Sequence, residues 1–385
     1  MSGSVHLLEP DIEAGVPDIR DDDEPDVPFR PRMFKPSDVL VMVGSAVSAL
    51  CLTWVVYYRL TPLEGALGYW VCAYLAFLVI YWLVIRDRQG SLAAKDRLAA
   101  VAVSTTAALL LTGLLLILGY TLYRGYHALR PSFFTQDQQR VGALSKSTAG
   151  GGEHAIIGTL EQVALAVAIS VPLGVITAVF LNEIGGRLAR PVRIIVDSMS
   201  SIPSILAGLF IYAIWVLKPL HEGQSGLAAA LALSVLMLPT VARTCEVVLR
   251  LVPGGLREAS LALGSSEWRA AWRVVLPTAK AGLFTAVILG IARAVGETAP
   301  VLLTAGGSFR VQPNPLAGRQ DSLPLFVYRY IGFAQKSEVD RAWTGALVLI
   351  GLVLVLFNIA RLLGSRGPGR QSRRARKRQL AKEVT

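Results

Sequence analysis

The sequence predicts an all-α polytopic membrane protein. Of its 385 residues, 53% are hydrophobic and the mean hydropathy is +0.51, which is too apolar for a single water-soluble core. Several apolar runs reach the roughly 20 residues that an α-helix needs to cross a bilayer. The three cysteines and four histidines are scattered without the spacing of metal ligands. We therefore expect neither a metal site nor a disulfide. Because Cys51, Cys72 and Cys245 all fall inside predicted spans, we expect them to be small buried apolar residues.

The predicted elements follow one another from a polar tail at one end to a basic tail at the other. Residues 1–37 are rich in proline and acidic at 21–24, so we expect a disordered acidic cytoplasmic tail. Two spans form an extra N-terminal transmembrane hairpin within residues 38–86. The predicted spans lie at 39–58, 65–85, 98–123, 155–182, 192–217, 227–248, 281–304 and 343–362. The last six belong to a transmembrane domain of residues 95–363, and residues 364–385 form a basic cytoplasmic tail.

Loop charge sets the predicted orientation. Eight spans place both termini on one side, and most of the 38 Lys and Arg residues lie in segments on that side. Both termini and the polar segment 250–280 are therefore expected to face the cytoplasm. The basic tail directly follows a span, so we expect it to lie against anionic lipid and predict no nucleic-acid partner.

The polar segment 250–280 has the pattern of two short amphipathic helices between two spans. Apolar residues recur at helical spacing on both sides of Gly264, a residue suited to a tight turn. Pro253 before the helices and Pro277 after them are expected to break the chain. The segment predicts a helix-turn-helix that projects from the membrane. An ordinary interfacial loop would share part of this pattern.

Two pairs of opposite charges lie inside predicted spans, where an unpaired charge is costly. Arg243 and Glu246 are three residues apart and Arg293 and Glu297 are four apart, so each pair shares a helix face. Counted from Ala281, Arg293 lies roughly 18 Å into its span, close to the middle of the bilayer. A guanidinium there stays charged and needs an anion, a carboxylate or water. Contact with an anionic substrate and a purely structural pair with Glu297 are the two interpretations.

Residues 258–277 resemble the cytoplasmic signature loop of ABC importer permeases. That signature reads Glu-Ala-Ala, three free positions, Gly, nine free positions, Ile, one free position and Leu-Pro. The matching residues here are Glu258, Ala259, Ser260, Gly264, Val274, Leu276 and Pro277. Ser260 replaces the second alanine and Val274 replaces the isoleucine. The resemblance implies that the loop sits in a groove on a partner ATPase and converts its closure into a tilt of the adjacent spans.

A narrower resemblance concerns one branch of these permeases. Residues 291–306, with the sequence IARAVGETAPVLLTAG, and residues 238–264 are similar to the PstA-type permease family of bacterial phosphate importers. Residues 201–210 and 158–183 resemble further core segments of that family. The resemblance covers about residues 95–363 and implies an ABC importer permease core of six transmembrane helices. The N-terminal hairpin, for which we favour an additional anchor, and both tails are additions to this core, giving eight spans in total.

The resemblance also implies partners and a location. They are a homologous second permease subunit, two ATPase subunits that hold ATP and Mg²⁺, and an extracytoplasmic phosphate-binding protein, in the bacterial inner membrane. We expect the outer segment 306–341 to dock this binding protein. Phosphate would pass a translocation path lined by Arg293, Glu297, Thr298, Arg243, Glu246 and Ser204. This chain has no Gly-x-x-x-x-Gly-Lys-Ser/Thr loop, so we expect it to bind no cofactor and to catalyse no reaction itself.

Other functions stay open at this stage. A permease for sulfate or molybdate would use the same charge and donor chemistry, because Arg binds tetrahedral anions in general. An ion-driven secondary transporter would also need buried charges, but it often shows inverted repeats, and no convincing pair occurs here. A membrane enzyme would need a defined constellation of reactive groups, which the scattered His and Cys residues do not supply.

Overall fold

The computed structural model describes residues 36–364 except 63, 143 and 218–222, and the regular elements in these ranges are all helices. Seven helices are long and apolar enough to cross a membrane, or eight if one bent pair counts as a single span. The predicted all-α polytopic fold is confirmed. Of the two predicted tails, residues 1–35 and 365–385 lie outside the described residues.

The chain divides into two compact units, residues 1–112 and 113–385. The first unit holds α1 (Pro36–Val55), the π-helical turn η1 (Val56–Leu60), α2 (Ala66–Gln89) and the first part of α3 (Ser91–Tyr126). In this unit α1 packs against α2, and the Tyr57 hydroxyl donates to the Gly65 carbonyl at 3.1 Å across the turn. Arg97 on α3 pairs with Asp38 on α1 at 2.9 Å.

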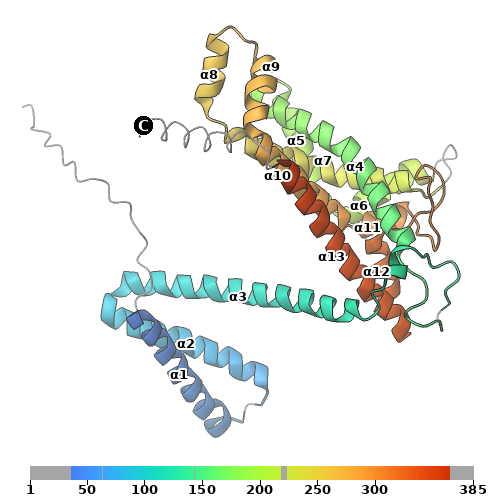
Figure 1. Ribbon diagram of the computed structural model, residues 1–385. Helices are drawn as coiled ribbons and strands as arrows, with labels where there is room; N and C mark the ends of the chain where they lie inside the picture. The colour runs from blue at the N-terminus through green and yellow to red at the C-terminus, as the bar shows by residue number, and fades with distance from the viewer. Residues whose placement is uncertain (1–35, 63, 143, 218–222, 365–385) are drawn as a thin grey trace, which may run out of the picture. The chain divides into compact units, whose positions relative to one another are not determined.

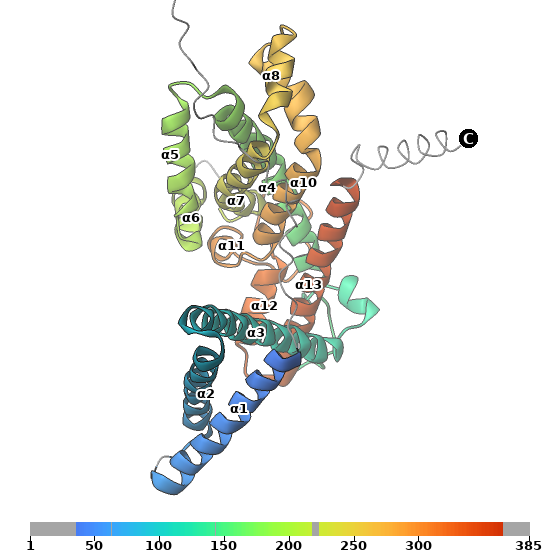
Figure 2. The same ribbon diagram turned by 90° about the vertical axis from the view of Figure 1, so that its left-hand side faces the viewer.

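The second unit contains the remaining helices. They are η2 (Pro131–Phe134), α4 (Glu153–Val179), η3 (Phe180–Ile184), α5 (Ala189–Ser200), α6 (Ser204–Ile211), η4 (Tyr212–Val216), α7 (Gly226–Arg250), α8 (Gly254–Ala262), α9 (Glu267–Ala270), η5 (Ala271–Val275), α10 (Leu276–Val295), α11 (Ala299–Thr304), α12 (Leu323–Ile331) and α13 (Lys336–Gly364). Within this unit, Figure 1 shows α8 and α9 at one end and α12 at the opposite end. Figure 2 shows the same order from a second direction, with α4, α7 and α10 between the two ends.

The centre of the second unit is a close contact of α4, α7 and α10. Val241 on α7 lies between Gly174 on α4 and Gly290 on α10. A β-carbon on either glycine would come within 2.8 Å of the Val241 side chain. Small residues let membrane helices approach closely, because packing rather than water exclusion drives their association. Buried Ala, Val, Leu, Met and Cys side chains continue this contact into one core cluster that also includes η5.

One predicted span is broken in the structure. The sequence predicted a continuous helix at 192–217, whereas α5 and the helix that starts at Ser204 meet at an angle of 103°. Pro203 explains the break, because proline lacks the backbone N–H of a continuing helix and disfavours the helical conformation of the residue before it. The second half then packs on α11, where a β-carbon on Gly208 would lie 2.5 Å from the Cα atom of Pro300.

A second span begins and ends earlier than predicted. The continuous helix covers Glu267–Val295 instead of 281–304, and α11 follows as a separate short helix. Pro277 does not break the chain as expected. The π-helical turn η5 precedes it directly, and such a wide turn accommodates a residue without an N–H group. Arg293 therefore lies in the last turn of α10, near the end of this continuous helix, and its depth in the bilayer stays a prediction.

The burial of the cysteines differs from the expectation for two of the three. All three are free, but only Cys245 is buried. Cys51 on α1 and Cys72 on α2 are exposed in the isolated chain, because few residues of these two helices are buried against the rest of the chain. Position within a span therefore did not predict burial in the protein core.

The contact between α6 and α11 gives a prediction for stability. The β-carbon in Gly208→Ala would meet the backbone of Pro300, so α11 must shift to make room. We expect a loss of about 1–3 kcal/mol, the usual cost of overpacking, measured as a lower Tm of the purified protein in detergent. Gly351→Ala is the matched control, because no heavy atom lies within 4 Å of its added β-carbon. An unchanged Tm in Gly208→Ala would contradict the contact.

Candidate functional site

Glu246 on α7 is the buried centre of a charge cluster. Its side chain is 2% exposed, and its Oε1 atom accepts from Arg250 at 2.6 Å and from Arg193 at 2.8 Å. The predicted Arg243–Glu246 pair is present at 3.8 Å, and Arg243 also pairs with Asp197 on α5. Because the cluster contains three arginines and two carboxylates, its net charge is +1. The cluster ties α5 to the last turns of α7.

Sequence reasoning missed three members of this cluster. Arg250 follows Glu246 by four residues, so helical spacing was a visible signal for that contact. Arg193 and Asp197 are also four residues apart, but their contacts reach across to α7. Spacing within one helix cannot show which neighbouring helix its side chains meet.

Arg293 and Glu297 lie at the junction of α10 and α11. The Nε atom of Arg293 is 3.8 Å from the Oε1 atom of Glu297, and its Nη1 atom is 3.5 Å from the Thr240 hydroxyl on α7. The first distance is near the upper limit for an ion pair and the second is near the upper limit for a hydrogen bond. The Arg293 side chain is 57% exposed in the isolated chain. Among the described residues, the guanidinium thus has loose partners and leaves most of its five donors accessible.

One face of α7 connects the two charged places. Thr240, Arg243 and Glu246 follow at three-residue intervals, so they lie along one side of the helix over about 9 Å. Thr240 contacts Arg293 and Glu246 centres the arginine cluster. The sequence-predicted charged residues therefore border a single polar stripe.

Ser204 and Thr298 lie at the starts of α6 and α11, and both are half-buried. The Gly208–Pro300 contact brings these two helices together. In the described part of the chain, no hydrogen bond joins Ser204 or Thr298 to Arg293. The residues predicted to line the translocation path thus lie on neighbouring helices, but hydrogen bonds do not join them into a single site.

The predicted helix-turn-helix is present as α8 and α9. Gly264 has a φ of +79°, a conformation that glycine adopts without strain. The Ser265 hydroxyl donates to the Ser260 carbonyl at 2.7 Å and closes the turn. Glu258 and Ala259 are exposed, as the resemblance to a docking loop implies.

The remaining signature residues differ in their surroundings. Leu276 is partly buried and packs against the core cluster, whereas Pro277 is exposed. The apolar face of the hairpin is uncovered: Leu263 is 90% exposed, and the rings of Trp268 and Trp272 are both half-exposed with centroids 5.5 Å apart. Exposed apolar surface framed by polar residues is typical of a protein-interaction site.

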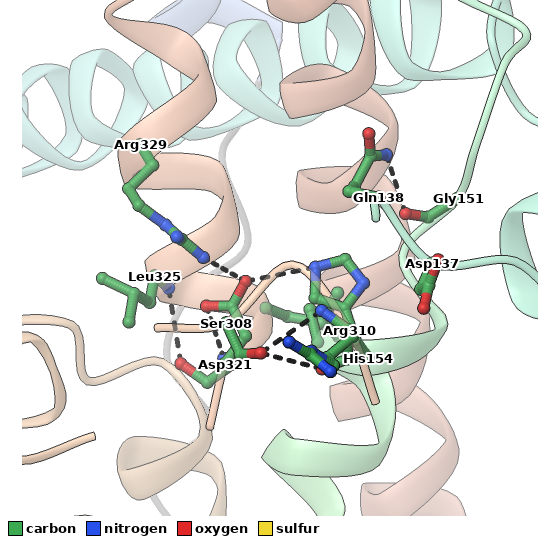
Figure 3. A network of polar contacts seen from close by, with 12 residues as sticks. Asp137, Gln138, Gly151, His154, Ser308, Arg310, Asp321, Leu325 and Arg329 are labelled. Atoms are coloured by element: carbon green, nitrogen blue, oxygen red, sulfur yellow. Dashed lines mark hydrogen bonds and ion pairs between the residues drawn. The ribbon is translucent and has the colours of Figure 1, made fainter. Parts of the chain in front are cut away.

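A second polar network lies at the opposite end of this unit, beside α12. The carboxylate of Asp321 is fully buried, pairs with Arg329, and lies 3.3 Å from the Nε2 atom of His154 (Figure 3). The neighbouring Gln320 accepts from Gln162 on α4 at 3.1 Å. These contacts fix the segment between α11 and α12 to the first turns of α4. No pattern in the sequence predicts the contacts with α4, because Gln162 and Gln320 are 158 residues apart and His154 is still farther from Asp321.

Comparisons with known proteins agree with this geometry. Residues 170–366 match the family described as binding-protein-dependent transport system inner membrane component. The phosphate transport system permease protein PstA 1 of Mycobacterium tuberculosis is 43% identical over 238 residues, which are 62% of this chain and 77% of that protein. The phosphate transport system permease protein PstA of Pasteurella multocida is 36% identical over 241 residues, which are 60% of this chain and 85% of that protein.

A solved structure shares the fold. It is a bacterial alginate ABC transporter in complex with an alginate pentasaccharide-bound periplasmic protein, with a TM-score of 0.52 and 14% sequence identity. The match covers 74% of this chain and 97% of that chain. At this identity the likeness concerns the arrangement of helices alone.

The shared acceptor on Glu246 gives a prediction for stability. Arg193 and Arg250 donate to the same oxygen, so either one keeps the buried carboxylate paired when the other is removed. Because the Arg193 and Arg250 side chains are 41% and 57% exposed, solvent screens both pairs, and Arg193→Gln and Arg250→Gln should each lower the free energy of unfolding by less than about 1 kcal/mol. The double variant should cost about 1 kcal/mol more than their sum, since only Arg243 at 3.8 Å remains. Denaturation in detergent measures the difference, and strict additivity would contradict a shared role.

Proposed function

The chain belongs to the binding-protein-dependent transport system inner membrane component family, and we propose that it is the permease subunit of an ATP-driven importer of inorganic phosphate. The observation that carries the proposal is the 43% identity to a phosphate transport permease over 77% of that protein's length. The same name on a Pasteurella relative that is 36% identical supports it. The chain is a multi-pass membrane protein and a transport subunit.

The hairpin of α8 and α9 supplies the contact with the energy source. We assign its exposed Glu258, Ala259 and Leu263 to a groove on a partner ATPase, the subunit that binds ATP and Mg²⁺ and hydrolyses the ATP. The turn residues Ser260 and Gly264 set the shape of the hairpin. Leu276 and Pro277 begin the span that receives the motion. Uncovered apolar surface on the hairpin supports this assignment, since such surface is stabilised by a partner.

The polar stripe on α7 and the junction of α10 and α11 line the translocation path in this proposal. Arg293 presents a planar group of donors that suits a tetrahedral oxyanion, and its loose contacts with Glu297 and Thr240 can be exchanged for the ion. Weak contacts fit transport, because the ion must leave as well as enter. Thr298 and Ser204 add hydroxyl donors, and Arg243 with Glu246 extends the path toward the ATPase end.

The outer network prepares a docking platform for a phosphate-binding protein. Asp321 and Gln320 hold the segment after α11 against α4, while Arg310 and Arg319 in the same segment are exposed. A rigid segment with exposed cations can bind a protein partner without first being ordered. The second permease subunit completes the path from its own side, and both termini of this chain face the cytoplasm.

Stimulation of the ATPase by the transported ion tests the proposed function. The assembled complex in proteoliposomes should hydrolyse ATP faster when its binding protein carries phosphate, and labelled phosphate should accumulate. Sulfate and molybdate, offered with the same proteins, should cause neither effect. Accumulation of sulfate or molybdate instead would assign the permease to another oxyanion, and accumulation without ATP but with an ion gradient would make it a secondary transporter.

A substitution in the hairpin turn separates docking from membrane insertion. Valine at position 264 cannot adopt a φ of +79° without strain, so Gly264→Val should distort the hairpin and leave the spans inserted. Phosphate uptake should fall to background while the protein stays in the membrane, as measured by immunoblot and radiolabelled uptake. Glu258→Lys should also lower phosphate uptake, because it reverses an exposed charge.

Gly255→Val is the control for the turn, since the φ of Gly255 is not positive and open space surrounds it. Normal uptake by correctly inserted Gly264→Val protein would refute the assignment.

Replacing the charged pair at the α10–α11 junction tests the path. Arg293→Lys keeps the charge but loses the planar group of five donors, so uptake should fall about tenfold, in line with the 1.5–3 kcal/mol typical of hydrogen bonds to charged groups. Arg293→Gln/Glu297→Gln removes both charges. Because the pair is loose and Arg293 is exposed, the double variant should assemble normally and still fail to import phosphate. Uptake near the parental rate in the double variant would exclude both side chains from the path.

A further inference from the structure

We propose that the ion pair between Arg257 and Glu183 is the mechanical link that makes the hairpin of α8 and α9 move together with α4. The inference rests on the proposed function, because it assigns positioning residues to the coupling step of an ATP-driven permease. Neither residue belongs to the signature match or to the polar stripe on α7. In this proposal both residues act by positioning the hairpin and do not contact the transported ion.

The pair joins three elements at one guanidinium. Arg257 on α8 donates through Nε and Nη2 to the two carboxylate oxygens of Glu183, at 2.8 and 2.7 Å. Glu183 lies on η3, the turn that directly continues α4. The same Nη2 atom donates to the Leu249 carbonyl, in the last turn of α7, at 3.0 Å. One side chain of the hairpin thus holds the cytoplasmic ends of two spans.

The surroundings of the pair make it directional and persistent. The Glu183 side chain is 5% exposed and accepts a further hydrogen bond from Asn182 at 2.6 Å. Solvent therefore screens the attraction only weakly, and the two parallel hydrogen bonds fix the orientation of the guanidinium. The next residue, Glu258, is exposed and makes no hydrogen bond or ion pair among the described residues. Of these two adjacent side chains on α8, Arg257 thus contacts the rest of the permease, and Glu258 is accessible to a partner.

The hairpin needs such a link on the side of α8. Its second helix continues through η5 into α10, so motion reaches α10 along an unbroken helix. No covalent connection of this kind leads from the hairpin to α4. Within α8 no residue is buried, Pro253 precedes it and its first two residues are glycines, so apolar packing holds this helix only weakly. Arg257 adds direct hydrogen bonds from α8 to the end of α4 and to α7.

Two variants separate the link from simple stability. Arg257→Lys keeps one positive charge but cannot form two parallel hydrogen bonds to Glu183 and a third to Leu249 at once. Arg257→Gln/Glu183→Gln removes both charges and leaves no buried carboxylate without a partner. Arg190→Lys is the matched control, because Arg190 on the cytoplasmic part of α5 is exposed and has no hydrogen bond or ion pair within the described residues.

Distances between two spin labels measure the link directly. Labels at Ala262→Cys on α8 and Leu173→Cys on α4 are introduced after replacement of the three native cysteines, since both positions are exposed. In the assembled complex, a non-hydrolysable ATP analogue should leave the distance distribution of the parental protein unchanged, because the two elements move as one body. The distribution should shift or broaden in both Arg257 variants and not in Arg190→Lys. A parental-like response in the Arg257 variants would overturn the inference.

The amount of phosphate imported per ATP hydrolysed gives the functional readout. We expect it to fall about tenfold in Arg257→Gln/Glu183→Gln, within the range that changes along a coupling network produce, while the ATPase subunits still co-purify. An unchanged amount of phosphate imported per ATP would overturn the link. If the double variant instead loses its ATPase subunits during purification, the pair is structural and the link is likewise overturned. If the parental complex imports no phosphate, the proposed function fails, and the spin-label distances still decide the inference.

Discussion

The close approach of α4, α7 and α10 at Val241 is the constraint on which the rest of the second unit depends. Gly174 and Gly290 give the valine room, and any larger side chain at either glycine would separate the helices. Because lipid is as apolar as a leucine side chain, this packing, and not the removal of water, holds the helices together. The contact sets the distance from α7 to both neighbours and so positions every charged group along it.

Two of the charged groups of the unit lie against α7, one near the middle of the helix and one in its last turns. Glu246 is buried and shared by three arginines, whereas Arg293 is exposed and held only loosely by Glu297 and Thr240. A shared buried carboxylate resists rearrangement, while a loosely held guanidinium can exchange partners. Helix α7 therefore carries the fixed charge cluster in its last turns and, nearer its centre, Thr240, which contacts the loosely held Arg293 of α10.

Polar contacts also fix both ends of α4. At its start, His154 and Gln162 meet Asp321 and Gln320, and beyond its end Glu183 meets Arg257. Hydrogen bonds in surroundings of low dielectric constant are stronger than in water, so both anchors restrain the helix. The segment between α11 and α12, α4 and the hairpin thus form a continuous line of contacts through the unit.

The sequence by itself determined the all-α membrane class, the helix-turn-helix with its Gly264 turn, and the pairs at helical spacing, because each depends on the hydropathy or backbone geometry of neighbouring residues. It failed at the break before Ser204, where Pro203 interrupts the predicted span, and at Pro277, which follows a π-helical turn and does not interrupt the helix. Only the tertiary structure decided that Arg193 joins Glu246, that Arg257 meets Glu183, and that His154 meets Asp321. These contacts join residues 53 to 167 positions apart, and spacing along one helix carries no information about which neighbouring helix its side chains reach.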